Sequence, residues 1–252
     1  MIEIFILSLI QGISEFLPIS SSSHLIIFSE FTQFDKQSLT IDVSLHIGSF
    51  LAVTVYFYKD IINFFYNKDL FFKVFLTSLP VMFMGYLLVK YNLIEELRNI
   101  KVIGWTTLIF GILLFVSDKF KLEKSIANNF NYKSAIFIGL FQMLSLVPGV
   151  SRSGISITAA RFLNFNRFDS AKLAFLISLP TLAAVSIFGI NNLIKTNNLD
   201  FSLFNITSIF LSFTFSFITI KYFLEFIKRF NLIVFVIYRV LLGLILLFIS
   251  YL

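Results

Sequence analysis

Six stretches of the chain are almost continuously apolar and long enough to cross a lipid bilayer. They lie at about residues 40–58, 70–90, 102–118, 171–190, 203–227 and 231–251. A spanning α-helix needs ~20 mostly apolar residues, because each residue advances the helix by only ~1.5 Å. The pattern therefore predicts an all-α, polytopic integral membrane protein with about six spanning helices.

Two further apolar regions are interrupted by polar residues near their middle. Residues 2–31 contain Gln11, Glu15, Pro18, the serines Ser20, Ser21, Ser22 and Ser23, and His24. Residues 134–163 contain Gln142, Pro148, Gly149, Ser151, Arg152, Ser153 and Gly154. Non-helical polar backbone at membrane depth is tolerated only where it is buried in protein or lines a wet cavity. We therefore predict that both regions are re-entrant helix–break–helix hairpins.

The two interrupted regions resemble each other. Residues 9–22 are LIQGISEFLPISSS, and residues 140–153 are LFQMLSLVPGVSRS. Both contain Leu-x-Gln, a serine three residues after the glutamine, a proline and Ser-x-Ser, and each region precedes three predicted spans. Such paired interruptions are typical of an internal repeat with its site at the repeat interface. We predict one membrane domain over 1–252, an inverted repeat with halves 1–120 and 130–252.

Composition and charge agree with a membrane protein. Hydrophobic residues make up 58% of the chain and charged residues only 13%, against about a quarter in soluble domains. With no cysteine, the chain has no disulfide, thiol nucleophile or Cys-ligated metal. The net charge of +6 comes without a basic stripe or a nucleic-acid motif, so we expect no nucleic-acid partner.

The distribution of Lys and Arg predicts the orientation. If the six spans alternate and both hairpins are re-entrant, one side of the membrane carries 13 of these residues and the other carries 5. Cytoplasmic loops carry the excess of Lys and Arg. Both termini are therefore expected outside, with the first hairpin entering from outside and the second from the cytoplasm.

The first hairpin brings together several groups with acid–base or anion-binding chemistry. Gln11 and Glu15 are four residues apart, on one helical face. Pro18 is expected to end that helix, and the serines that follow are expected to begin the next. The free N–H groups at a helix N-terminus stabilise an anion. This segment therefore supplies a carboxylate, hydroxyls, the His24 imidazole and an anion-binding helix end.

The second hairpin supplies the cation that the first hairpin lacks. Its Pro148–Gly154 segment predicts a flexible turn followed by another serine-capped helix. Arg152 offers a fixed charge and a forked set of donors that match phosphate oxygens. Two helix N-termini, an arginine and many hydroxyls favour a highly negative ligand, and a diphosphate fits better than a single carboxylate.

Simpler roles are also open for these residues. Serines in membrane helices commonly serve close packing, and a Glu15–Arg152 pair can simply hold two halves together. Ionisable groups inside a membrane are nevertheless costly and are functional by default. We expect His46 to be a hydrogen-bonded interior residue, and Arg239, in the last span, to serve helix packing or bind backbone carbonyls.

At the two hairpins the sequence resembles the undecaprenyl-diphosphate phosphatase family, which is associated with bacitracin resistance. The main matches are Gln11 to His24 and Pro148 to Gly154, with weaker matches at Asp42 to Val53, Ala160 to Leu163 and Tyr238 to Gly243. The resemblance implies a hydrolase of the bacterial inner (plasma) membrane, with its active site facing the outer, periplasmic side. Its substrate would be a polyprenyl diphosphate, dephosphorylated to regenerate the lipid carrier for peptidoglycan synthesis. A homodimer is also implied.

The resemblance also implies roles for individual residues. Glu15, Ser21, His24 and Arg152 are the expected catalytic residues, with Ser21 as nucleophile and His24 as an acid–base or nucleophilic group. The expected substrate-binding residues are Gln11, Ser20, Ser22, Ser23, Ser151 and Ser153. Two positions depart from the family pattern: position 11 is Gln where some members have Glu, and position 156 is Ser where Thr is usual.

A metal ion is a further expectation. A divalent cation, Mg²⁺ or Ca²⁺, would bridge Glu15 and the diphosphate. Because Gln11 is neutral, the protein alone offers few anionic ligands, so we expect the metal to bind only with substrate.

Two other classes of function stay open from the sequence. A transporter or flippase of the lipid carrier is compatible with broken helices in an inverted repeat. A purely structural membrane subunit does not explain why Glu15, His24 and Arg152 occur together.

Overall fold

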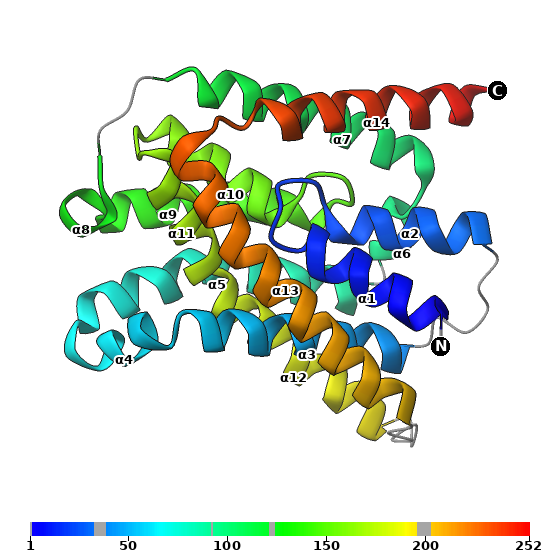
Figure 1. Ribbon diagram of the computed structural model, residues 1–252, viewed down its shortest axis with the longest axis horizontal. Helices are drawn as coiled ribbons and strands as arrows, with labels where there is room; N and C mark the ends of the chain where they lie inside the picture. Colours follow the sequence, from blue (N-terminus) through cyan, green and yellow to red (C-terminus); the bar gives the residue numbers. More distant parts are fainter. Residues whose placement is uncertain (1, 33–38, 92, 121–123, 196–202) are drawn as a thin grey trace.

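The computed structural model describes residues 2–32, 39–91, 93–120, 124–195 and 203–252 (Figure 1). The first half contains α1 (Ile2–Ser14), α2 (Ser21–Thr32), α3 (Leu39–Tyr56), α4 (Tyr58–Tyr66), α5 (Lys68–Lys90), α6 (Ile94–Leu97) and α7 (Ile100–Asp118). The second half contains α8 (Ile126–Asn129), α9 (Tyr132–Met143), the 3₁₀ helix η1 (Leu144–Leu146), α10 (Arg152–Phe162), α11 (Arg167–Leu176), α12 (Ser178–Lys195), α13 (Leu203–Arg229) and α14 (Ile233–Tyr251). The described ranges contain no strand beyond one isolated bridge between Lys124 and Phe165.

Membrane-spanning helices dominate the described part of the chain, as predicted. Five are long and apolar enough to cross a bilayer: α5, α7, α11 with α12, α13 and α14. α3 and α4 meet at Phe57 with a bend of 66°, and they make a sixth span if the bent pair is counted as one. The first predicted span, 40–58, thus runs into this bend. Lys59 and Asp60 begin the amphipathic α4, and such polar residues favour the membrane surface over its core.

The two interrupted regions form helix hairpins. The first consists of α1 and α2, with 13 and 12 residues, and the second of α9 and α10, with 12 and 11 residues. None of these helices reaches the ~20 residues of a full span. The two turns lie side by side near the middle of the molecule (Figure 1), where Ser153 Oγ donates to the carbonyl of Leu17 over 2.7 Å.

The packing of the hairpins is reciprocal. α1 of the first half packs on α13 of the second, and α9 of the second half packs on α5 of the first. α3 packs on α12, and α7 packs on α14. Glycine permits one close approach: a Cβ on Gly139 of α9 would lie 2.6 Å from the Thr77 carbonyl oxygen of α5. An inverted repeat predicts this exchange, although its boundaries, 1–120 and 130–252, stay a prediction.

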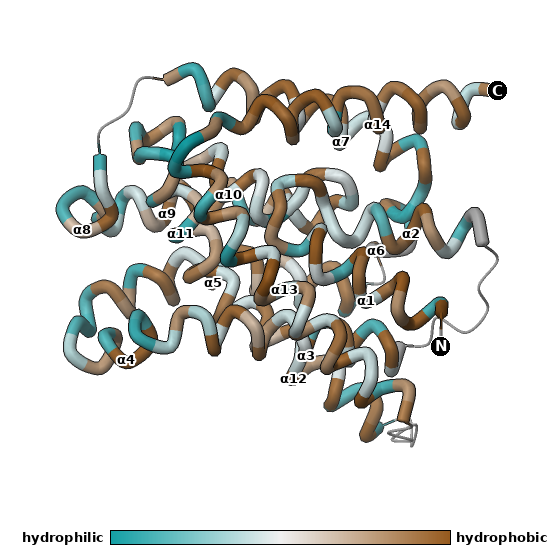
Figure 2. Tube along the Cα trace, viewed as in Figure 1, coloured by the Kyte–Doolittle hydropathy of each residue, from teal (hydrophilic) through white to brown (hydrophobic). Residues whose placement is uncertain are grey.

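The outer surface is apolar, while many small polar groups lie inside. Figure 2 shows hydrophobic residues along most of α7 and α14 and hydrophilic residues around α4 and α8. Inside, Ser49 Oγ of α3 lies 3.2 Å from Ser212 Oγ and 3.0 Å from Ser216 Oγ of α13. Buried serines with small side chains allow membrane helices to pack closely and bond to one another.

Candidate active site

A cavity of about 200 Å³ lies where the two hairpin turns meet. Its lining comes from both hairpins and from α3, α5 and α12. The polar lining residues are Ser14, Glu15, Ser20, Ser21, Ser22, His46, Ser145, Ser151, Arg152 and Thr181, and the apolar ones are Val81, Leu146, Leu182 and Val185. A carboxylate and a guanidinium in one cavity at membrane depth make this the candidate active site.

The two hairpin turns share an unusual backbone conformation. Ser20 has φ 75° and Ser151 has φ 71°, and each directly precedes a helix, α2 and α10 respectively. Residues with side chains seldom adopt positive φ, and such strain concentrates at functional sites. The first residues of both helices line the cavity, so the free N–H groups of two helix starts lie beside it and favour an anion.

Glu15 is the centre of the hydrogen-bond network. Its Oε2 accepts from Ser21 Oγ at 2.5 Å and from Gln11 Nε2 at 3.1 Å. Its Oε1 accepts from Arg152 Nη2 at 2.6 Å. Only 7% of the Glu15 side chain is exposed, so this carboxylate depends on these partners for its stability as an anion. A serine hydroxyl that donates to a carboxylate is the arrangement of a nucleophile and its base.

Arg152 connects the second hairpin to the first hairpin and to α12. While Nη2 bonds Glu15, Nη1 donates to Thr181 Oγ1 at 2.6 Å and to the Ser178 carbonyl at 3.4 Å. The Glu15–Arg152 pair therefore does hold two halves together, the structural role considered above. The guanidinium also lines the cavity, where it can contact a phosphate oxygen.

His24 lies apart from this network. Its Nδ1 is 2.6 Å from the Ser20 carbonyl, and its Nε2 is 2.5 Å from the Tyr238 hydroxyl of α14. The two rings are stacked, with centroids 5.7 Å apart. Both ring nitrogens are therefore engaged away from Ser21. The geometry favours Glu15, not His24, as the acceptor of the Ser21 proton, and the catalytic role of His24 stays a prediction.

The expected substrate-binding residues divide into two groups. Ser20, Ser22 and Ser151 line the cavity. Gln11, Ser23 and Ser153 do not line it. Instead, Gln11 bonds Glu15, Ser23 Oγ lies 3.0 Å from Ser20 Oγ, and Ser153 bonds Leu17 across the hairpins. These three side chains support the turns rather than face a ligand.

Comparison with known proteins agrees with the hairpin motifs. The family model described as bacitracin resistance protein BacA matches residues 4–245. The chain belongs to the BacA family. A relative from Pelagibacter ubique, named undecaprenyl-diphosphatase, is 48% identical over 99% of this chain and 98% of its own length. Relatives of the same name from Alcanivorax borkumensis and Jannaschia sp. are 40% and 36% identical, each over 98% of this chain and at least 97% of their own.

Four polar residues that line the BacA-family cavity were not predicted as site residues from the sequence: Ser14, His46, Ser145 and Thr181. His46 lines the cavity, although its Nδ1 also lies 2.8 Å from the Asp42 carbonyl, as expected for an interior residue. The rule that ionisable groups inside a span are functional could have identified it. Thr181, which bonds Arg152, carries no comparable signal, because threonine is common in membrane helices.

Arg239 of this BacA-family chain donates hydrogen bonds to the backbone of both hairpin turns. The side chain is fully buried, and its guanidinium donates to four carbonyls. Nη1 bonds Pro18 at 3.3 Å, Nη2 bonds Gly149 at 2.8 Å and Val150 at 3.0 Å, and Nε bonds Thr107 of α7 at 3.3 Å. The predicted carbonyl-binding role is confirmed, and one arginine thereby fixes the breaks of both hairpins.

The BacA-family residues do not by themselves make a strong metal site. Among the described residues, no group of three His, Asp or Glu side chains has metal-binding geometry. Glu15 is the one carboxylate among the described residues that line the cavity, and it is paired with Arg152, whose charge opposes a cation. A tightly held Mg²⁺ or Ca²⁺ needs more oxygen ligands than this donor set supplies.

Proposed function

We propose that this chain hydrolyses undecaprenyl diphosphate to undecaprenyl phosphate and inorganic phosphate. This reaction recycles the lipid carrier for peptidoglycan synthesis, and the family is associated with bacitracin resistance. The observation that carries the proposal is the contact of Ser21, Glu15 and Arg152 at one cavity between the hairpins. The names of the relatives, undecaprenyl-diphosphatase, support the substrate and the reaction.

The proposed reaction begins with Ser21. Its Oγ attacks the terminal phosphorus, and its proton passes to Glu15 Oε2, 2.5 Å away. The bond between that phosphorus and the bridging oxygen breaks, so undecaprenyl phosphate leaves and a phosphoserine remains. Water then attacks the phosphoserine and becomes part of the released inorganic phosphate, while the departing Ser21 oxygen takes back the proton from Glu15. A rival route has water attack directly, with Ser21 only orienting the phosphate.

A cationic side chain and free backbone N–H groups stabilise the negative charge of the phosphates. Arg152 and the N–H groups at the starts of α2 and α10 face the same cavity. Phosphoryl transfer is catalysed mainly by positioning and by electrostatic stabilisation of this kind. Because one Arg152 nitrogen already bonds Thr181, the guanidinium is held in place before substrate arrives.

The distribution of Lys and Arg supports a proposal for the membrane and for the side of it that the active site serves. The protein is a multi-pass membrane protein, and the excess of Lys and Arg on one side supports a bacterial inner membrane with that side in the cytoplasm. The cavity would then serve the outer, periplasmic side. We propose that a divalent cation enters with the diphosphate oxygens. A homodimer stays a prediction.

A transporter or flippase is less well supported. The Ser21–Glu15 hydrogen bond supplies a nucleophile with a base, which transport does not require. The deciding experiment is phosphate release from undecaprenyl diphosphate by purified protein in detergent, where no sealed membrane allows transport. One phosphate per substrate is expected. Unchanged substrate after long incubation with Mg²⁺ or Ca²⁺ would favour the transporter.

A further inference from the structure

A second cavity, with a mostly apolar lining, adjoins the candidate active site. This α5–α12 groove has a volume of about 440 Å³ and lies between α5 and α12, beside the second hairpin turn. It shares four lining residues with the polar cavity: Val81, Leu146, Thr181 and Val185. The two spaces therefore adjoin each other, because the same four side chains line both.

The chemistry of the lining changes at Thr181. This residue accepts a hydrogen bond from Arg152 and so marks the edge of the polar cavity. Beyond it the groove is lined by apolar and aromatic side chains, including Met82, Tyr86, Ala184 and Phe188. A polar cavity that adjoins an apolar groove fits a ligand that has an anionic head and a hydrocarbon tail.

We propose that the α5–α12 groove seats the head-proximal isoprene units of a polyprenyl diphosphate, an assignment that rests on the proposed phosphatase function. Along α5 the groove runs from Val81 to Val89, about 12 Å at ~1.5 Å per residue. That length holds the start of a long prenyl chain, and the remainder extends among the membrane lipids. Recognition therefore depends on the first isoprene units rather than on total chain length.

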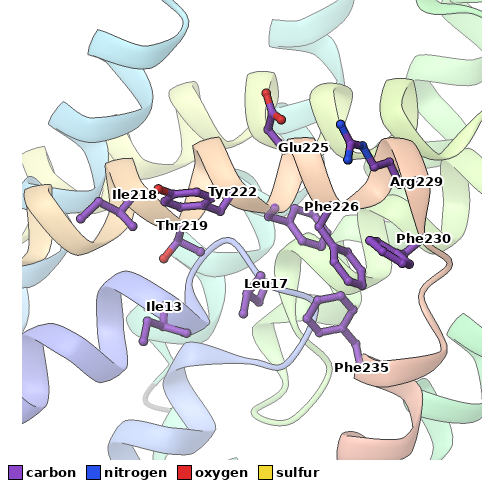
Figure 3. A pocket seen from close by; sticks show the side chains of 11 residues that line it. Ile13, Leu17, Ile218, Thr219, Tyr222, Glu225, Phe226, Arg229, Phe230 and Phe235 are labelled. Carbon is purple, nitrogen blue, oxygen red and sulfur yellow. The ribbon is translucent and has the colours of Figure 1, made fainter.

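Another apolar groove provides a natural comparison. It has a volume of about 630 Å³ and lies along α13, where Leu17 faces Phe226 and Phe235 (Figure 3). No described residue lines both this α13 groove and the polar cavity. A tail lying there does not adjoin a head group beside Glu15 and Arg152, so the α13 groove serves as the control.

Filling the α5–α12 groove tests the proposal. Ala184→Phe narrows it from α12, and Gly85→Leu narrows it from α5. A Cβ at position 85 meets Leu146 Cδ2 at an ordinary 3.4 Å, so the site accepts a residue with a side chain. Thr219→Phe fills the α13 groove by a comparable volume.

Each variant is assayed for phosphate release from farnesyl diphosphate and from dimethylallyl diphosphate. The five-carbon chain of dimethylallyl diphosphate is too short to fill the α5–α12 groove.

Both filling variants are expected to raise KM for farnesyl diphosphate about ten-fold, since burial of two methylene-sized groups is lost. Their kcat/KM for dimethylallyl diphosphate should stay within about two-fold of wild type. For Thr219→Phe, the KM for farnesyl diphosphate and the kcat/KM for dimethylallyl diphosphate should also stay within about two-fold of wild type. Equal effects of Ala184→Phe and Thr219→Phe, or equal losses for both substrates, contradict the groove assignment. Absence of phosphate release from undecaprenyl diphosphate by wild-type protein contradicts the proposed function instead.

Photolabelling of wild-type protein makes the test independent of any variant. A farnesyl diphosphate analogue with a diazirine on its second isoprene unit is irradiated with the protein, and the labelled peptides are sequenced. Labels on α5 or α12, near Tyr86 or Phe188, are expected. Labels on α13 or α14, near Tyr222 or Phe235, would overturn the proposal.

Discussion

Arg152 Nη2 lies 2.6 Å from Glu15 Oε1, and this contact joins two hairpins whose residues are 137 positions apart in the chain. Each hairpin alone has only part of the chemistry. The first has the carboxylate and the Ser21 hydroxyl, and the second has the cation. The candidate site exists because the two turns meet.

Removal of the Ser21 hydroxyl should abolish most of the activity. Ser21→Ala is expected to lower kcat at least about 100-fold, because the nucleophile hydrogen-bonded to Glu15 is lost. The measurement is phosphate release from undecaprenyl diphosphate. Ser44→Ala is the matched control, since Ser44 is buried on α3 and bonds only the Thr40 carbonyl there. Near-normal turnover by Ser21→Ala would leave direct attack by water as the mechanism.

Tyr238→Phe should affect the reaction only modestly. The change removes the hydroxyl that lies 2.5 Å from His24 Nε2 but keeps the stacked ring. A single hydrogen bond contributes ~0.5–1.5 kcal/mol, so kcat is expected to fall no more than about ten-fold. His24→Gln should cause a larger loss if the imidazole itself takes part. Should both variants match wild type in steady-state kinetics, His24 has no catalytic role.

Arg239 should prove essential for the geometry of both turns. Arg239→Met leaves the carbonyls of Pro18, Gly149 and Val150 without their donor, at a cost of ~1–3 kcal/mol for each buried group. We expect a melting temperature several degrees lower and a large loss of kcat, with Arg239→Lys intermediate. Arg229→Met on the exposed end of α13 is the control. Wild-type melting and turnover in Arg239→Met would exclude a positioning role.

Metal binding should depend on substrate. Calorimetry with Mg²⁺ or Ca²⁺ and the protein alone is expected to give a dissociation constant of about millimolar or weaker, because Glu15 is already paired with Arg152. Addition of a non-hydrolysable methylene-bridged farnesyl diphosphonate should lower the dissociation constant of the metal ion at least about ten-fold. Micromolar binding to the protein without the diphosphonate contradicts this expectation.

Much of this architecture is visible in the sequence because the bilayer imposes simple rules. Apolar length predicts the spans, and polar interruptions predict the hairpins, since unpaired polar groups are not tolerated in lipid. The excess of ionisable residues in two short segments likewise indicates where the site lies. Glu15 and Arg152 were predictable on these grounds, and Ser21 through the family resemblance, although their contacts were not.

Other features depend on contacts between distant segments and have no local signal. Arg239 reaches Pro18 across 221 positions, and Thr181 meets Arg152 only because α12 passes the second turn. The displacement of His24 towards Tyr238 depends on where α14 packs. The sharp bend at Phe57 was also missed, because the apolar pattern continues up to it.

A double-mutant cycle on Glu15 and Arg152 tests the central claim most directly. Phosphate release from undecaprenyl diphosphate is measured for wild type, Glu15→Gln, Arg152→Gln and the double variant. If the two hairpins form one active site, each single change lowers kcat/KM at least about 100-fold, and the double variant is far less impaired than the product of the two effects. Wild-type rates in either single variant, or fully multiplicative losses, would contradict a shared site.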